Sequence, residues 1–174
     1  MYKGEQVKDF MESQLGNRGA QARSYCGLPS GQPWCNAEVS YAFYKCDAKS
    51  LYCNGRKETY CPHSIQWCYS NLADLPVYLA LPGDIVYFDW EMNGVPNHIR
   101  FARERVNDLQ LDTVEGNTSG GKVANRTREA KYVQAVFRPH YTVPKSEYDV
   151  TKPLAIDGKF GFNSIAKTQY VLES

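Results

Sequence analysis

The stretch that decides the fold is Pro33-Trp34-Cys35-Asn36-Ala37-Glu38-Val39-Ser40-Tyr41-Ala42-Phe43-Tyr44. Glycines and prolines just before it exclude regular structure, so a helix can begin only near Trp34 or Cys35. Apolar side chains then recur at helical spacing, which predicts an amphipathic helix with one buried stripe. Cys35 would lie in its first turn, where free backbone N–H groups and the helix dipole stabilise an anion. A thiol in that position loses its proton more readily, and the thiolate is the nucleophilic form.

The composition is that of one ordinary globular domain. The chain has 174 residues, of which 43% are hydrophobic and 22% are charged, and its net charge is +1. It has no long basic run, so nothing points to a nucleic-acid partner. No apolar run is long enough to span a bilayer, and we expect no membrane insertion.

Further helices are predicted in the first half of the chain. Residues 5–15 place apolar side chains at helical spacing. Residues 17–33 are polar and broken by glycine and proline, which predicts a loop. A later helix opens at Pro62-His63-Ser64, with Ser64 as its N-terminal cap.

The second half of the chain is typical of strands, which we expect at residues 84–90, 98–106, 109–114, 122–127 and 132–138. Helices followed by consecutive short strands predict an α+β fold, with the helices packed on an antiparallel sheet of about five to six strands. We expect this domain to span residues 1–141. Residues 142–153 contain prolines and mixed charges and are interpreted as a linker, and a short segment at 154–174 follows.

A cysteine hydrolase needs a base beside its thiol and a polar group that orients the base. His98 begins a predicted strand directly after a turn, which would place its ring at an edge of the sheet. Glu115 and Asn117 end the next strand two residues apart, so they share a face while that strand is extended. A hairpin through Asn107-Asp108 would bring both toward the imidazole. Each residue also has a plain structural interpretation, because a lone cysteine or histidine usually packs in a core and a polar strand end is usually solvated.

Taken in order, four motifs resemble the CHAP domain, the family of cysteine, histidine-dependent amidohydrolases and peptidases that is related to NlpC/P60 and papain-like hydrolases. They are Trp34-Cys35, Pro82-Gly83-Asp84-Ile85-Val86-Tyr87-Phe88-Asp89-Trp90, Asn97-His98-Ile99 and Val114-Glu115-Gly116-Asn117-Thr118-Ser119. The resemblance covers roughly residues 5 to 141, and it is specific because the motifs fall in the family's order. It implies a papain-like α+β fold and an enzyme that cleaves amide bonds in bacterial peptidoglycan without a cofactor.

The resemblance also implies a role for each site residue. Cys35 would be the nucleophile, His98 the general base, Glu115 the orienting third member and Asn117 a supporting polar group. Gln32, three residues before the nucleophile, could donate to an oxyanion hole or could merely solvate its loop.

These roles predict an endolysin-type peptidoglycan hydrolase, either an endopeptidase or an N-acetylmuramoyl-L-alanine amidase. Two alternatives stay open: a catalytically impaired module that binds the cell wall, and a transamidase or acyltransferase on the same fold. Residues 154–174 are similar to part of a helical peptidoglycan-binding domain, with Asp157-Gly158 opening its characteristic turn. The first residues contain no apolar secretory segment. We therefore expect a monomeric phage lysin that is made in the cytoplasm of the host bacterium and acts on the cell wall, with a secreted autolysin that lost its leader as the alternative source.

Two features depart from the family's pattern. Arg100 stands where many members have glycine, two residues after His98. On an extended strand the two side chains share a face, so we expect a long cation that flanks the site and narrows the groove. Some members also carry an acidic calcium-binding loop before the nucleophile. Residues 16–33 contain no aspartate or glutamate, so we expect no such metal site.

The remaining cysteines could be thiols or metal ligands. Cys46, Cys53, Cys61 and Cys68 follow one another at intervals of seven, eight and seven residues, with His63 nearby. Structural zinc sites usually contain closely paired cysteines, which this spacing lacks. The spacing therefore favours free or buried thiols, with zinc binding as the alternative.

Overall fold

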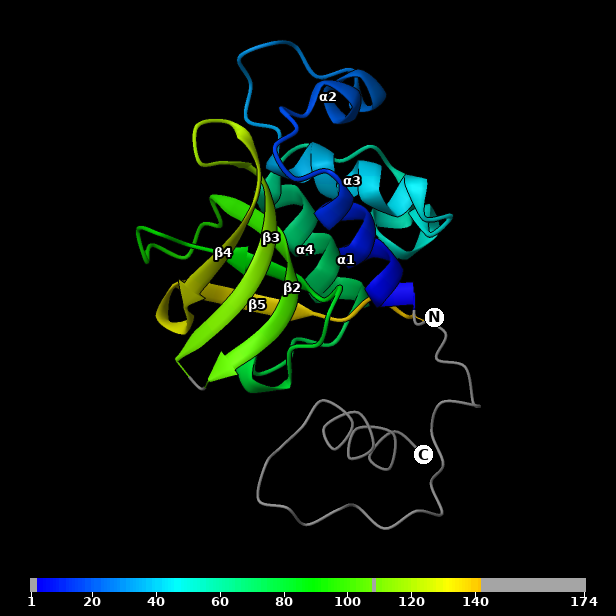
Figure 1. Cartoon of the computed structure of the whole chain (residues 1–174). Helices are drawn as coiled ribbons and strands as arrows, with labels where there is room; N and C mark the ends of the chain where they lie inside the picture. Colours follow the sequence, from blue (N-terminus) through cyan, green and yellow to red (C-terminus); the bar gives the residue numbers. More distant parts are fainter. Residues whose placement is uncertain (1–2, 108, 142–174) are drawn as a thin grey trace. The chain divides into compact units, whose positions relative to one another are not determined.

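Figure 1 shows a computed structural model of the chain, which describes residues 3–107 and 109–141. The chain divides into a compact unit of Met1–Tyr141 and a second unit of Thr142–Ser174. The predicted linker at 142–153 and the predicted wall-binding segment at 154–174 lie outside the described residues.

The first half of the chain is helical. Its α-helices are α1 (Lys3–Ser13), α2 (Ala20–Cys26), α3 (Cys35–Lys45) and α4 (Cys61–Asn71). Short 3-10 turns are η1 (Lys49–Leu51), η2 (Cys53–Gly55), η3 (Val77–Leu79) and η4 (Ala130–Tyr132). The strands are β1 (Ile85–Phe88), β2 (His98–Asn107), β3 (Gln110–Thr118), β4 (Lys122–Glu129) and β5 (Val133–Phe137).

Two helical predictions are wrong in detail. Residues 17–33 are not all loop, because α2 forms between Gly19 and Gly27, whose φ angles of 69° and 67° bound the helix at both ends. The buried side chain of Ala22 contributes the packing that stabilises so short a helix. Helix α4 begins at Cys61, so Ser64 is not its cap; the Ser64 hydroxyl lies inside the first turn and donates to the Cys61 carbonyl at 3.0 Å.

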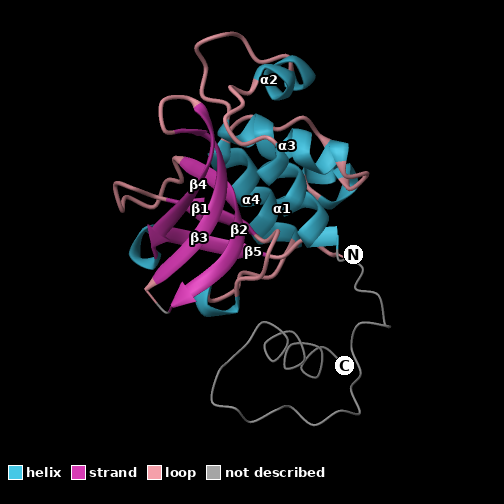
Figure 2. Cartoon of the chain, viewed as in Figure 1, coloured by secondary structure: helices cyan, strands magenta, loops and turns pink. Residues whose placement is uncertain are grey.

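The strands form one five-stranded antiparallel sheet in the order β4-β3-β2-β1-β5. The α+β prediction is confirmed. In Figure 2, helices α1, α3 and α4 lie together beside this sheet, and α2 lies farther out near the start of α3. Strand β2 occupies the middle of the sheet. Its first residue, His98, therefore lies where a central strand begins, and not on one of the two outer strands. Opposite it in the register is Phe88, the last residue of β1.

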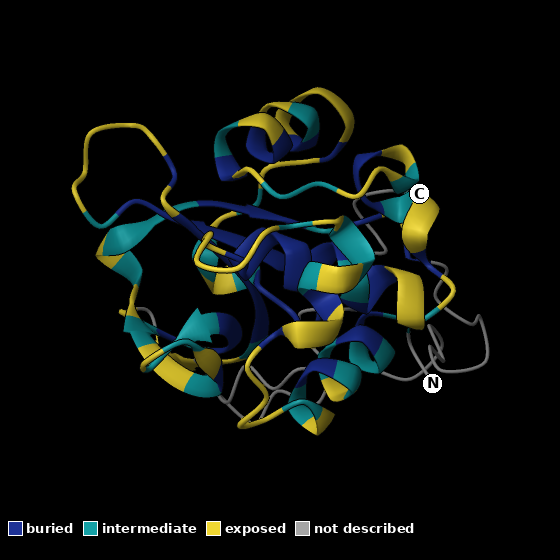
Figure 3. Cartoon of the chain, turned by 90° about the horizontal axis from the view of Figure 1, so that it is seen from above, coloured by how far each residue is buried: buried dark blue, intermediate teal, exposed yellow. Residues whose placement is uncertain are grey.

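Apolar side chains cover both faces of the central strands. On the helical side, the Phe43 ring of α3 meets Phe101 of β2 with a centroid separation of 5.5 Å. A second buried cluster, which includes Val86, Phe88 and Leu111, lies on the opposite face. Figure 3 shows this burial running through the middle of the unit. Among residues 3–107 and 109–141, no helix is long and apolar enough to cross a membrane.

Candidate active site

Cys35 is the first residue of α3, as the Gly/Pro-rich approach to it predicts. Its side chain is 5% exposed. The pKa of this thiol is held well below its usual value, chiefly by a hydrogen bond from Cys61 and also by His98 and the backbone N–H of Ile99, although burial opposes them. Cys35 is therefore poised as a thiolate.

His98 links the thiol to the sheet. Its Nε2 lies 3.3 Å from Oε2 of Glu115. Cys35 also lies close enough to the ring to raise its pKa. Burial lowers the pKa of His98, but the Cys35 thiolate and the Glu115 carboxylate outweigh it and raise that pKa. The pair therefore favours imidazolium beside thiolate.

Glu115 is the most heavily bonded side chain of the site. It is 0% exposed, and Thr113 Oγ1 donates to its Oε1 at 2.8 Å. The guanidinium of Arg128 donates to both carboxylate oxygens, from Nε to Oε1 at 2.9 Å and from Nη2 to Oε2 at 2.9 Å. Arg100 donates to Oε1 as well. Burial raises the pKa of Glu115, but His98 and the two arginines hold it far below its usual range. Glu115 therefore lies beside His98 and is ionised.

Arg100 corrects an expectation. Its side chain is 0% exposed and lies under the site, with its guanidinium carbon 3.7 Å from the centre of the Phe88 ring. Burial lowers the pKa of Arg100 to about 9. Its Nε and Nη2 find no hydrogen-bond partner within the described part of the chain. Arg100 does flank the site, but the prediction that it narrows the groove is wrong, because its ion pair with Glu115 keeps the side chain buried.

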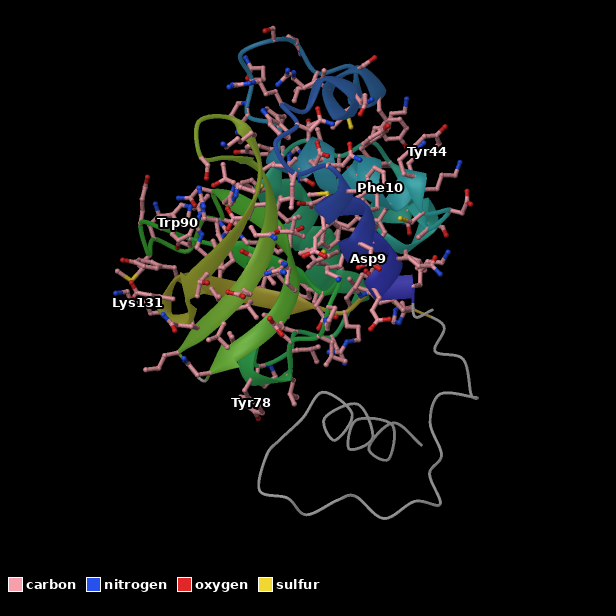
Figure 4. All side chains as sticks on the ribbon, in the orientation of Figure 1. Asp9, Phe10, Tyr44, Tyr78, Trp90 and Lys131 are labelled. Carbon is pink, nitrogen blue, oxygen red and sulfur yellow. The ribbon has the colours of Figure 1, made fainter. Side chains whose placement is uncertain are left out.

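Asn117 lies near the site but not as predicted. Its φ of 56° and a register shift between Glu115 and Thr118 break the extended strand, so the two-residue alternation does not apply there. Asn117 instead lines a pocket of about 240 Å³ together with Trp90, His98, Thr118 and Arg128. Figure 4 labels Trp90 on the side of the sheet away from α1.

Sequence reasoning missed two residues of this site. Arg128 comes from β4, and only the register of β3 with β4 brings it toward Glu115. Cys61 comes from the start of α4, and its sulfur lies 3.8 Å from the sulfur of Cys35. Its position at the opening of a Pro-initiated helix is the one sequence signal that could have drawn attention to it. Gln32, the candidate oxyanion donor, is exposed on the loop before α3.

Glu38 lies one turn after Cys35 and is also buried. Burial raises the pKa of its carboxyl to about 7, although the charge of Arg23 opposes the shift. The helix packs closely against Gly116 here: a Cβ on that glycine would lie 2.8 Å from Glu38 Cβ and 3.0 Å from the Trp34 ring. Gly116 therefore permits β3 to approach α3 directly beside Glu115.

All six cysteines lie in the described residues and are free thiols. Burial raises the pKa of Cys53 and of Cys68 to about 12, so both stay protonated. In residues 3–107 and 109–141, no three or more His, Cys, Asp or Glu side chains gather as a group that could hold a metal ion. The zinc alternative raised by the cysteine spacing thus gains no support from the geometry.

No family model, curated protein or solved structure matches the chain. Membership of the CHAP family therefore stays a prediction from the four motifs. The geometry itself brings together a buried thiol, an imidazole and a carboxylate in that order. Such an arrangement can form a covalent acyl intermediate, because it has a nucleophile, a proton carrier and a group that orients the carrier.

Proposed function

We propose that this chain is a cysteine hydrolase that cleaves an amide bond in bacterial peptidoglycan. The observation that carries the proposal is that His98 lies beside the Cys35 thiol, while its Nε2 is 3.3 Å from Oε2 of Glu115. A thiol on the first turn of a helix, with a histidine supplied by the packed sheet, is also the layout that the CHAP resemblance implies.

The reaction follows from the groups on hand. The Cys35 thiolate attacks the amide carbonyl carbon, and the imidazolium of His98 gives its proton to the leaving amine. The resulting thioester is attacked by water, from which His98 takes a proton, and the acid product leaves as the thiolate reforms. The free backbone N–H groups in the first turn of α3 would donate to the oxyanion. Glu115 keeps the imidazole oriented and stabilises its charged form.

Peptidoglycan as the substrate rests on the sequence resemblance. The four motifs point to a family of wall hydrolases, and residues 154–174 are similar to part of a wall-binding domain. The alternative of an impaired binding module depended on Arg100, and that argument falls away because Arg100 supports Glu115 instead of obstructing the groove. A transferase would use the same thioester and pass the acyl group to an amine.

The test measures the turbidity of purified bacterial walls and the mass of the released products. We expect Cys35→Ala to abolish lysis, while Cys46→Ala, a matched change of a thiol remote from the relay, leaves it near wild type. His98→Ala should be as damaging as Cys35→Ala, and the double variant no worse, because residues that act as a unit are non-additive. Products with a new carboxylate and a free amine indicate hydrolysis, whereas a ligated product indicates a transferase. Substantial lysis by Cys35→Ala would refute the proposed nucleophile.

A further inference from the structure

Two buried thiols face each other at the starts of two helices. Cys35 opens α3 and Cys61 opens α4, and their sulfur atoms are 3.8 Å apart. The two residues are 5% and 6% exposed. A disulfide bond is about 2.05 Å long, so the sulfur atoms must approach by less than 2 Å, which small side-chain rotations can supply.

A polar network fixes these two helix starts relative to each other. Asn36, next to the nucleophile, donates to the Ser64 hydroxyl of α4 at 2.8 Å and accepts from the Tyr52 hydroxyl at 2.6 Å. The hydroxyl of Tyr87, on β1, donates to the same serine at 2.8 Å. Because all of these groups are buried and satisfied by one another, the approach of the two thiols is held by the fold.

We propose that Cys61 is a resolving thiol, which forms a reversible disulfide with Cys35 when a peroxide oxidises the nucleophile. The Cys35 thiolate attacks one oxygen of hydrogen peroxide, the O–O bond breaks, and the hydroxide that leaves takes up a proton to form water. The product is a sulfenic acid on Cys35. The Cys61 thiol then attacks that sulfur; the S–O bond breaks, and the hydroxyl departs as a second water with the thiol's proton. The two thiols have together supplied the two electrons that reduce the peroxide.

The surroundings of the pair assign a different part to each thiol. Cys35 is the thiolate of the two, because Cys61 and His98 both donate toward it. The thiolate raises the pKa of Cys61, as does burial, while the charge of Arg100 opposes them. The imidazolium of His98, whose pKa Cys35 raises, is the proton source for the departing hydroxide in this scheme. Resolution by Cys61 would stop the oxidation of Cys35 at a stage that a dithiol can reverse, before the irreversible sulfinic acid forms.

The experiment treats the full chain with hydrogen peroxide, removes the excess, and maps the peptides by mass spectrometry before and after dithiothreitol. In the wild type we expect a Cys35–Cys61 disulfide, two hydrogens lighter than the free peptides, which dithiothreitol reduces to the two free thiols. Cys61→Ser should give sulfinic acid on Cys35 instead. Cys46→Ser is the matched control, since Cys46 is a half-buried thiol bonded to the Gln6 carbonyl, and it should behave as the wild type.

Lysis of walls gives the parallel readout. Wild type and Cys46→Ser should regain most of their activity in dithiothreitol, whereas Cys61→Ser should regain less than about a tenth. Sulfinic acid on Cys35 of the wild type, or an unmodified Cys35, would overturn the proposal. Cys61→Ala serves as a second variant if the serine weakens the fold.

The loss of catalysis rests on the proposed function, but the linkage itself does not. A linkage in a protein that never lyses walls would refute the function and leave this inference standing.

Discussion

Glu115→Gln is the change that the structure predicts in most detail. It keeps the size of the side chain and removes the negative charge that Arg100 and Arg128 share. Arg128 is 26% exposed and can exchange the lost partner for water, but Arg100 is 0% exposed and cannot. Removing one partner of a buried ion pair costs about 3–5 kcal/mol, because the other charge stays buried without compensation. Domains of this kind are stable by about 5–15 kcal/mol, so the loss should be large but measurable.

Urea denaturation of a double-mutant cycle is the assay. Arg100→Met replaces the guanidinium with an apolar chain of similar reach and leaves Glu115 bonded to Arg128 and Thr113. We expect Arg100→Met alone to cost less free energy of unfolding than Glu115→Gln, and the double variant also to cost less than Glu115→Gln. Glutamine has nearly the size and shape of glutamate, so the packing stays constant. The cost of Glu115→Gln with Arg100 present, minus its cost with Arg100→Met, therefore measures the interaction of the two charges.

The same pair predicts a pH dependence. The pKa of Glu115 is lower in the folded chain than its ordinary value in an unfolded one, about 4.3. The folded state therefore gains stability from this carboxylate above that pH and loses it progressively as the pH falls below it. Glu115→Gln should flatten this part of the acid denaturation profile. A cost below about 1 kcal/mol, or free energies that simply add in the cycle, would show that the buried pair does not hold this region together.

Three further changes test other parts of the site. Gly116→Ala should lower the free energy of unfolding by about 1–3 kcal/mol in urea, because its Cβ would meet Glu38 Cβ at 2.8 Å; a neutral effect would contradict the close approach. Cys61→Ala removes the hydrogen bond that most lowers the pKa of Cys35, so alkylation of that thiol by iodoacetamide should reach half its maximal rate at a higher pH. An unchanged pH midpoint of alkylation would show that the Cys61 thiol does not stabilise the Cys35 thiolate. Asn117→Ala should slow wall lysis less than Glu115→Gln does, since it lines the pocket without a bond to His98, and a complete loss of lysis would reverse that order.

The order of helices and strands was predictable because local patterns dominate it. Apolar spacing and the Gly/Pro-rich approach set the start of α3, and turn residues separate the strands. Helix α2 escaped prediction because a seven-residue helix has too few apolar positions to show a period, and its stability comes from packing. The start of α4 was misplaced because a serine near a helix start resembles a cap, whereas Ser64 instead serves the buried network.

The site was predictable only as far as its motifs reach. Cys35, His98 and Glu115 come together as the order of the motifs implies. Arg128 could not be found, because its place depends on the register of β3 with β4, and β4 is mostly polar. The placement of Arg100 was wrong for a related reason: strand alternation gave its face correctly but could not show that this face is covered by Phe88 and Trp90.

The two arginines explain how a carboxylate can serve next to a thiolate–imidazolium pair. Without the two arginines, the buried carboxylate would bind a proton readily. It would then compete with His98 for the proton that the imidazolium gives to the leaving amine in the proposed mechanism. Arg100 and Arg128 lower the proton affinity of Glu115, so the proton stays on the imidazole. Arg100 also lowers the pKa of His98, against the raising effect of Cys35 and Glu115, which limits how tightly the imidazole holds that proton. A general base must both take and give a proton within one catalytic cycle. Because Arg100 lowers the pKa of His98 while Cys35 and Glu115 raise it, the imidazole can do both. In the proposed mechanism, the buried cation of Arg100 is thus part of the tuning of the relay.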